Sequence, residues 1–222
     1  MNIEMVDHPI QRDLIDRLMH SDGLKFSELK PNGMESNIFM YHLNSLIKSG
    51  YITKTANLYS LTAKGLTYVD SLSSSNLKPR KQPKLIAIIA VKNKDDEWLL
   101  LERKFQPYKD QLMLPSGKQH FGESIATHAN RELFEKTGLD VPLSYRGMAN
   151  ISMNEDSQVL THVVAHIHTG FSDDIKLPAE NDKFKFVLHN FKDNTKQLMP
   201  GTREIYKLLI SDESIFITNL EF

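Results

Sequence analysis

Acidic residues and one arginine recur at regular spacing in the middle of the chain, between residues 117 and 139. A cap at Glu123 or Ser124 and a closing Thr137-Gly138 predict a helix over residues 124–136, which places Glu132 and Glu135 on one face. Carboxylates that converge in this way repel one another unless a cation lies among them. Mg²⁺ prefers oxygen ligands and keeps waters that a phosphate can displace, so this spacing is typical of a metal site for phosphate chemistry.

The same stretch resembles the Nudix box, whose pattern is G-x5-E-x7-R-E-U-x-E-E-x-G-U, where U is apolar. The matching residues are Gly117, Glu123, Arg131, Glu132 and Glu135. The place of the second glutamate of the E-E pair holds Lys136 instead. The resemblance covers residue 85 to the C-terminus and implies an α/β fold, a Nudix α/β/α sandwich with a mixed sheet. Strand-like runs on both sides of one long helix favour the same architecture.

The resemblance also implies a chemistry. Members of this family hydrolyse nucleoside diphosphates linked to another moiety, using Mg²⁺ or Mn²⁺. By position, Glu132 is a metal ligand, and Glu135 is a ligand or orients the attacking water. The Gly117 carbonyl completes the metal shell, while Arg131 and Glu123 orient the helix through a salt bridge. The implied ligand is a nucleotide-derived small molecule.

Lys136 is the departure from the pattern that matters most for function. An ammonium about 5 Å from a divalent ion is repelled by roughly 6–7 kcal/mol at an effective dielectric near 20, before the flexible side chain relaxes. The missing ligand can be replaced by His128, by water, or by an acid after the box. Those acids are Glu155, Asp156 and Glu180. We therefore expect weakened metal binding with residual or altered activity.

Two functions of different classes follow. The sequence favours a Nudix pyrophosphohydrolase that cleaves a nucleoside diphosphate derivative with a divalent metal. The alternative is a transcription regulator whose Nudix domain senses a nucleotide metabolite such as ADP-ribose. Lys136 favours the regulator, and the otherwise intact box favours the hydrolase.

Two basic residues near the box are candidates for phosphate binding. Arg103 lies at the end of a strand-like run, and Lys118 follows the glycine of the box. Cationic side chains at such places can bind phosphate. For Arg103, a solvated strand end is an equally good interpretation. The contacts to a base or sugar are not located by the sequence.

The first third of the chain has a helical pattern with one hairpin. The order helix, short helix, helix, hairpin, helix resembles a winged helix-turn-helix domain between Pro9 and about Leu72. In such domains the third helix enters the major groove of DNA. Its solvent face here carries Asn37, Tyr41, Asn44 and Lys48. Basic residues do not outnumber acidic ones in this region, and such domains also mediate dimerisation, so DNA binding and a homodimer are both open.

A serine-, proline- and lysine-rich stretch separates the two regions. We predict a winged helix-turn-helix domain at 1–74, a linker at 75–84 and a Nudix domain at 85–222. The 222 residues include no cysteine, which excludes disulfides and thiolate metal sites, and a net charge of -1 gives no field toward anionic partners. No apolar run is long enough to span a bilayer and no signal peptide is recognisable, so we expect a cytoplasmic protein without a membrane partner.

Overall fold

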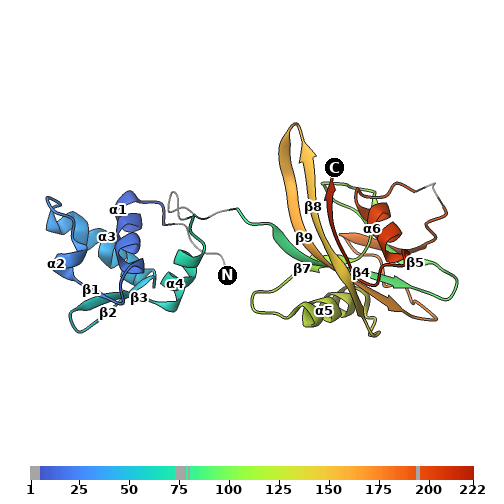
Figure 1. Ribbon diagram of the computed structural model, residues 1–222, viewed down its shortest axis with the longest axis horizontal. Coiled ribbons are helices and arrows are strands. Elements are labelled where there is room, and N and C mark those ends of the chain that lie inside the picture. The colour runs from blue at the N-terminus through green and yellow to red at the C-terminus, as the bar shows by residue number, and fades with distance from the viewer. Residues whose placement is uncertain (1–5, 74–78, 80, 194–195) are drawn as a thin grey trace. The chain divides into compact units, whose positions relative to one another are not determined.

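The computed structural model describes residues 6–73, 79, 81–193 and 196–222 (Figure 1). The chain divides into two compact units, Met1–Gln82 and Pro83–Phe222. Part of the predicted linker, residues 75–78 and 80, lies outside the described residues. No helix in the described part of the chain is long and apolar enough to cross a membrane.

The N-terminal unit packs its helices on a small antiparallel sheet. Its elements are α1 (Pro9–Met19), β1 (Leu24–Lys25), α2 (Phe26–Leu29), α3 (Ser36–Lys48), β2 (Ile52–Thr55), β3 (Leu58–Leu61) and α4 (Ala63–Asp70). In the sheet, β3 lies between β1 and β2. The helices and the hairpin occur in the order that the sequence predicts, whereas the two-residue strand β1 was not predicted. The assignment of this unit to the winged helix-turn-helix class stays a prediction.

The sequence explains where the helices of this unit begin and end. Helix α1 starts with a proline, which is favourable there because an N–H in the first turn has no acceptor within the helix. The His8 side chain accepts a hydrogen bond from the Ile10 N–H. Helix α3 ends just before Gly50, whose φ of 76° is costly for other residues. Phe39 and Leu43 of α3 are fully buried, so one face of this helix packs in the core and the other faces solvent.

The C-terminal unit is built on one mixed sheet of eight strands. Its elements are β4 (Lys84–Lys92), β5 (Trp98–Arg103), β6 (Leu112–Met113), β7 (Ser116–Lys118), α5 (Ile125–Thr137), β8 (Ser144–Glu155), β9 (Gln158–Phe171), β10 (Phe184–His189), α6 (Thr202–Leu209) and β11 (Phe216–Glu221). The main order of strands is β10-β5-β4-β9-β8-β11, with β6 paired to β5 and β7 paired to β4. The β4–β9 and β8–β11 pairs are parallel, and the others are antiparallel.

Helices α5 and α6 cover opposite faces of this sheet (Figure 1). Alternate residues of β4 point to opposite faces. Ala87 and Ile89 pack in the cluster that contains α5 residues, and Ile88 packs in the cluster that contains α6 residues. The predicted mixed α/β fold is therefore confirmed. The last strand, β11, was not predicted, because its short apolar run gains its partner only when β8 is folded beside it.

Candidate functional site

Helix α5 carries most of the box residues and has a well-defined start and end. The Ser124 side chain accepts a hydrogen bond from the Thr127 N–H at 3.1 Å, and Gly138 closes the helix in the left-handed conformation with φ 70°. Leu133 is buried against the sheet. The four-residue spacing of Ile125, Ala129 and Leu133 in the sequence predicts that all three face the core, but Ile125 is 39% exposed because it is the first residue of the helix. That core prediction is wrong.

Arg131 is the centre of a network of carboxylates. Its Nε lies 2.7 Å from Glu123 Oε1, and its Nη2 lies 2.9 Å from Glu123 Oε2. Its Nη1 donates to Glu132 Oε1 at 3.0 Å and to Glu135 Oε2 at 3.1 Å. Hydrogen bonds from Arg131 lower the pKa of Glu123 to about 2. The salt bridge expected between Arg131 and Glu123 is therefore present, and it ties the loop before α5 to the middle of the helix.

Lys136 completes the network from the next turn of α5. Its Nζ lies 2.9 Å from Glu132 Oε2, and it donates a hydrogen bond to the Ser116 carbonyl. Burial raises the pKa of Glu132, but the hydrogen bonds and charges of Lys136 and Arg131 outweigh burial, so the net effect is a lowered pKa. Glu132 is thus a buried carboxylate with a basic partner on each oxygen.

Strand β7 is held to α5 through three successive backbone carbonyls. The Ser116 carbonyl accepts from Lys136, the Gly117 carbonyl lies 3.1 Å from His128 Nε2, and the Lys118 carbonyl accepts from Arg131 Nη2 at 3.3 Å. A carbonyl only accepts, so His128 Nε2 must carry the ring proton. Burial lowers the pKa of His128, which favours this neutral imidazole.

Gly117 is needed because the Glu132 carboxylate lies directly against it. A Cβ at position 117 would lie 1.7 Å from Glu132 Oε2, far inside any van der Waals contact. A backbone without a side chain therefore allows β7 and α5 to approach each other.

The box residues in this arrangement do not fit a divalent metal ion. Both Glu132 oxygens and the Gly117 carbonyl face N–H donors, and the ammonium of Lys136 lies where a cation would meet Glu132. Glu135 is 56% exposed and is paired with Arg131. Across the described residues, no group of three or more His, Asp and Glu side chains could hold a metal ion. In this arrangement Gly117, Glu132 and Glu135 are paired with N–H donors instead of a metal. Their roles as metal ligands stay predictions.

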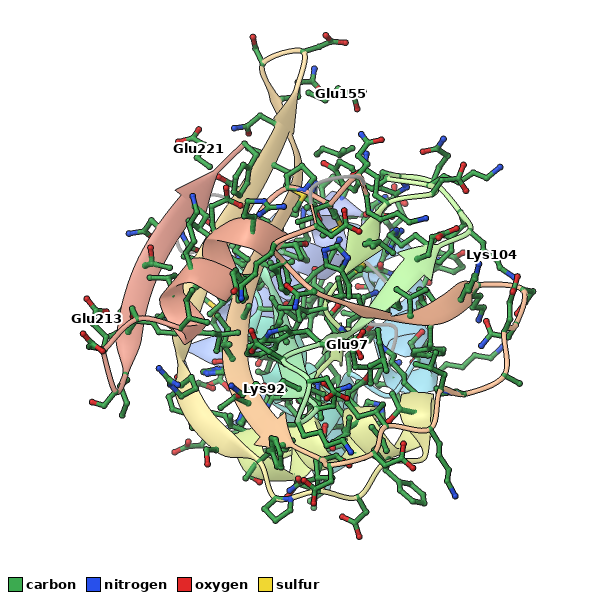
Figure 2. All side chains as sticks on the ribbon, turned by 90° about the vertical axis from the view of Figure 1, so that its right-hand side faces the viewer. Lys92, Glu97, Lys104, Glu155, Glu213 and Glu221 are labelled. Carbon is green, nitrogen blue, oxygen red and sulfur yellow. The ribbon has the colours of Figure 1, made fainter. Side chains whose placement is uncertain are left out.

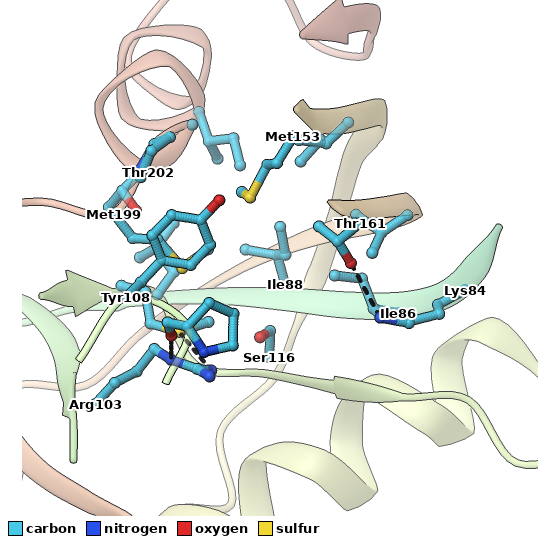
Figure 3. Close-up of a pocket in the computed structure, with 18 of the residues that line it drawn as sticks. Lys84, Ile86, Ile88, Arg103, Tyr108, Ser116, Met153, Thr161, Met199 and Thr202 are labelled. Atoms are coloured by element: carbon cyan, nitrogen blue, oxygen red, sulfur yellow. Dashed lines mark hydrogen bonds between the residues drawn. The ribbon is translucent and has the colours of Figure 1, made fainter. Parts of the chain in front are cut away.

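A cavity of about 370 Å³ opens on the other face of β4 and β7 (Figure 3). Ile86 and Ile88 of β4 line it, whereas their neighbours pack toward α5. Tyr108, Met153 and Met199 also line it and lie together around one part of it (Figure 3). This volume is in the range of small-molecule sites, and the apolar lining suits a flat organic group.

Basic side chains line the cavity, and none of its described lining residues is acidic. Arg103 and Lys118, the two predicted phosphate-binding residues, are both among them. Lys84 is a third, and it was missed because the sequence places it in a basic linker cluster. Lys84 Nζ lies 3.0 Å from Thr161 Oγ1, and Arg103 Nε donates to the Pro107 carbonyl at 2.9 Å (Figure 3). The antiparallel pairing of β4 with β7 brings Lys84 and Lys118 to one cavity, which no local signal reveals.

Among the described residues, the acids after the box form no group with its carboxylates that could hold a metal ion. Glu180 forms an ion pair with Lys104, which lowers the pKa of Glu180. Glu155 and Asp156 lie at the turn between β8 and β9, and Figure 2 shows Glu155 near the tip of this projecting hairpin. His128, the other candidate replacement ligand, is directed to the Gly117 carbonyl.

In the N-terminal unit, the four residues predicted for DNA contact are all exposed on α3. They are Asn37, Tyr41, Asn44 and Lys48. Tyr41 is 71% exposed. Their role in DNA contact stays a prediction.

Comparisons with known proteins agree with this fold and box. The NUDIX domain model matches residues 82–209, more than half of the chain. The chain therefore belongs to the Nudix family. No curated protein sequence matches it.

Several solved structures are similar in fold to the Nudix domain. One is a mutator MutT protein from Bacillus halodurans, with TM-score 0.53, 17% identity, and coverage of 63% of this chain and 90% of the other. Another is a MutT Nudix hydrolase from Burkholderia pseudomallei, with TM-score 0.50, 22% identity, and coverage of 58% and 99%. A bifunctional NMN adenylyltransferase/ADP ribose pyrophosphatase from Francisella tularensis, in complex with AMP and a Mn ion, gives TM-score 0.48, 18% identity, and coverage of 81% and 57%. At these identities the likeness of the first two structures concerns the fold alone.

Proposed function

We propose that the Nudix domain binds a nucleotide-derived ligand in the cavity beside the box and that the chain is a ligand-responsive regulator. The observation that carries the proposal is the apolar cavity with Lys84, Arg103 and Lys118 in its lining. The basic side chains favour an anionic group of the ligand, and the apolar wall favours a nucleobase or another flat group.

The regulator is preferred to the hydrolase because of Lys136. Hydrolysis of a pyrophosphate by this family's chemistry needs a divalent ion among the box carboxylates. In this chain the ammonium of Lys136 is already bound to Glu132. Binding of the ligand needs only the cavity, whereas turnover needs the box to open.

The pyrophosphohydrolase is the second candidate. It is favoured by the network of Glu123, Arg131, Glu132 and Glu135, which is complete apart from the lysine. Movement of the Lys136 side chain, which is 23% exposed, would free one oxygen of Glu132 for Mg²⁺ or Mn²⁺.

The N-terminal unit supplies the output in this proposal. We assign DNA binding to the exposed face of α3 and expect a homodimer, because helix-turn-helix dimers bind two half-sites. Light scattering of the purified chain measures the second expectation directly, and a monomer at micromolar concentration would contradict it.

A panel of ligands tests the function of the Nudix domain. ADP-ribose, NADH, diadenosine polyphosphates and nucleoside triphosphates are titrated by calorimetry and incubated with Mg²⁺ or Mn²⁺ for release of phosphate or nucleoside monophosphate. Binding of at least one ligand without turnover is the expected result. Efficient turnover would favour the hydrolase, and absence of any binding would reject the ligand site.

Variants of the cavity locate the site. Arg103→Gln and Lys118→Gln should each weaken binding of the selected ligand by about tenfold, since a hydrogen bond to a charged group contributes about 1.5–3 kcal/mol. Lys94→Gln is the matched control, because Lys94 is exposed in the turn after β4 and does not line the cavity. Equal affinity of all three variants would move the ligand away from this cavity.

A further inference from the structure

We infer that Lys136 is a built-in cation that replaces the divalent metal of the box. Its ammonium contacts two oxygens, the Oε2 of Glu132 and the carbonyl of Ser116. These oxygens belong to α5 and β7, the two elements that the Nudix pattern would join through a metal. The lysine therefore holds the helix to the strand without an ion.

The neighbouring oxygens also accept hydrogen bonds from protein groups. Glu132 Oε1 accepts from Arg131 at 3.0 Å, and the Gly117 carbonyl lies 3.1 Å from His128 Nε2. Both Glu123 oxygens accept from Arg131. A hard cation with several oxygen ligands would have to displace His128 and Lys136 together.

The charges give the same result. The network of Glu123, Glu132 and Glu135 with Arg131 and Lys136 has one net negative charge. Replacing Lys136 by the glutamate of the Nudix pattern lowers the charge of the network by two units. One divalent ion would restore it. A lysine at position 136 therefore gives the site the same net charge as a glutamate together with one divalent ion.

The inference deepens the proposed function and rests on it for one consequence. That consequence is that the ligand binds in the cavity without a divalent ion. Ser116 connects the two places, because its carbonyl binds Lys136 and the residue also lines the cavity. Lys136 keeps β7 in place from the helix side, and Lys118 of the same strand lines the ligand side.

Titration with Mn²⁺ alone tests the inference, with the free ion followed by electron paramagnetic resonance on the full chain. Wild-type protein should take up no Mn²⁺ at the box. Lys136→Glu should bind one ion with an affinity at least about tenfold above the upper limit that the titration sets for wild type, because a carboxylate replaces a repelling ammonium. Lys94→Glu, which makes the same charge change in an exposed turn, should behave as wild type.

A second substitution shows where the ion lies. Glu132→Gln in the Lys136→Glu chain should abolish the gained binding. Circular dichroism checks that each variant is folded. Uptake by wild type that Glu132→Gln abolishes would overturn the inference, even if Lys136→Glu does not fold. A folded Lys136→Glu chain that gains no affinity would overturn it too.

The outcome is separate from that of the proposed function, because no nucleotide is present. Failure of every nucleotide to bind would reject the proposed ligand site and would leave the Mn²⁺ result unaffected. Uptake of Mn²⁺ by the wild-type box would reject the role of Lys136 as a built-in cation and would leave the proposed ligand site in the cavity unaffected.

Discussion

Gly117 and Glu132 lie so close together that position 117 has no room for a side chain. A Cβ there would lie 1.7 Å from Glu132 Oε2. We predict that Gly117→Ala destabilises the chain by about 1–3 kcal/mol, because the backbone or the buried carboxylate must shift. The free energy of unfolding in urea measures this change.

A control and a double variant separate this contact from a general effect of replacing glycine. Gly23→Ala should have a much smaller effect, because the nearest atoms to its Cβ would lie at an ordinary 3.5 Å. Removing the carboxylate with Glu132→Ala should make Gly117→Ala less costly than it is alone. Strictly additive effects of the two substitutions would show that Glu132 is not what excludes the side chain.

Glu123 gives the box a pH dependence that can be measured. Arg131 lowers its pKa to about 2 from the ordinary 4.5. A carboxyl group with a lowered pKa in the folded state stabilises the fold fully above its unfolded pKa, and this stabilisation is lost as the pH falls. The relevant window runs from pH 4.5 down to about 2.

The variant Glu123→Gln should therefore be less stable than wild type at neutral pH, and the difference should shrink as the pH falls through that window. Urea unfolding at a series of pH values measures it. Glu213→Gln, which removes an exposed carboxylate outside the box, is the control. A difference between wild type and Glu123→Gln that is constant across the window would mean that the Arg131 pair does not hold the charge.

At the scale of the elements, the sequence predicted α5 well but did not predict the last strand, β11. The ends of α5 could be predicted because Ser124 and Gly138 are strong local signals. The salt bridge between Arg131 and Glu123 followed from the spacing of the Nudix pattern. Strand β11 could not be predicted, because its parallel pairing with β8 depends on a chain segment more than sixty residues away.

The role of Lys136 was beyond the sequence for a similar reason. The pattern showed that a lysine replaces a glutamate, and we expected it to weaken a metal site. That its ammonium reaches the Ser116 carbonyl depends on how β7 lies across α5. Lys84 entered the cavity through the pairing of β4 and β7, which is also a tertiary contact. Local spacing predicted the helix, and the contacts between elements determine the chemistry.

At the scale of the whole molecule, the two compact units suggest a division of tasks between ligand binding and output. If the exposed face of α3 binds DNA, Asn44→Ala should weaken binding to the preferred sequence by about 1–3 kcal/mol per base pair read. Lys48→Gln should weaken binding to all sequences and reduce the salt dependence.

Gel shifts with DNA from upstream of the coding sequence, at several salt concentrations, measure both effects. Lys94→Gln, in the other unit, is the control for the loss of one lysine. Absence of salt-sensitive binding by wild-type protein, with and without nucleotide, would contradict the DNA-binding role.

The central claim is that the Nudix domain binds its nucleotide-derived ligand without a divalent metal, because Lys136 supplies the cation of the box. The most direct measurement is calorimetric titration of the ligand selected from the panel, once in EDTA and once in Mg²⁺. We predict dissociation constants that agree within about threefold, less than 0.7 kcal/mol apart, and no hydrolysis product. Binding that requires Mg²⁺, or steady release of product when Mg²⁺ is added, would contradict the claim.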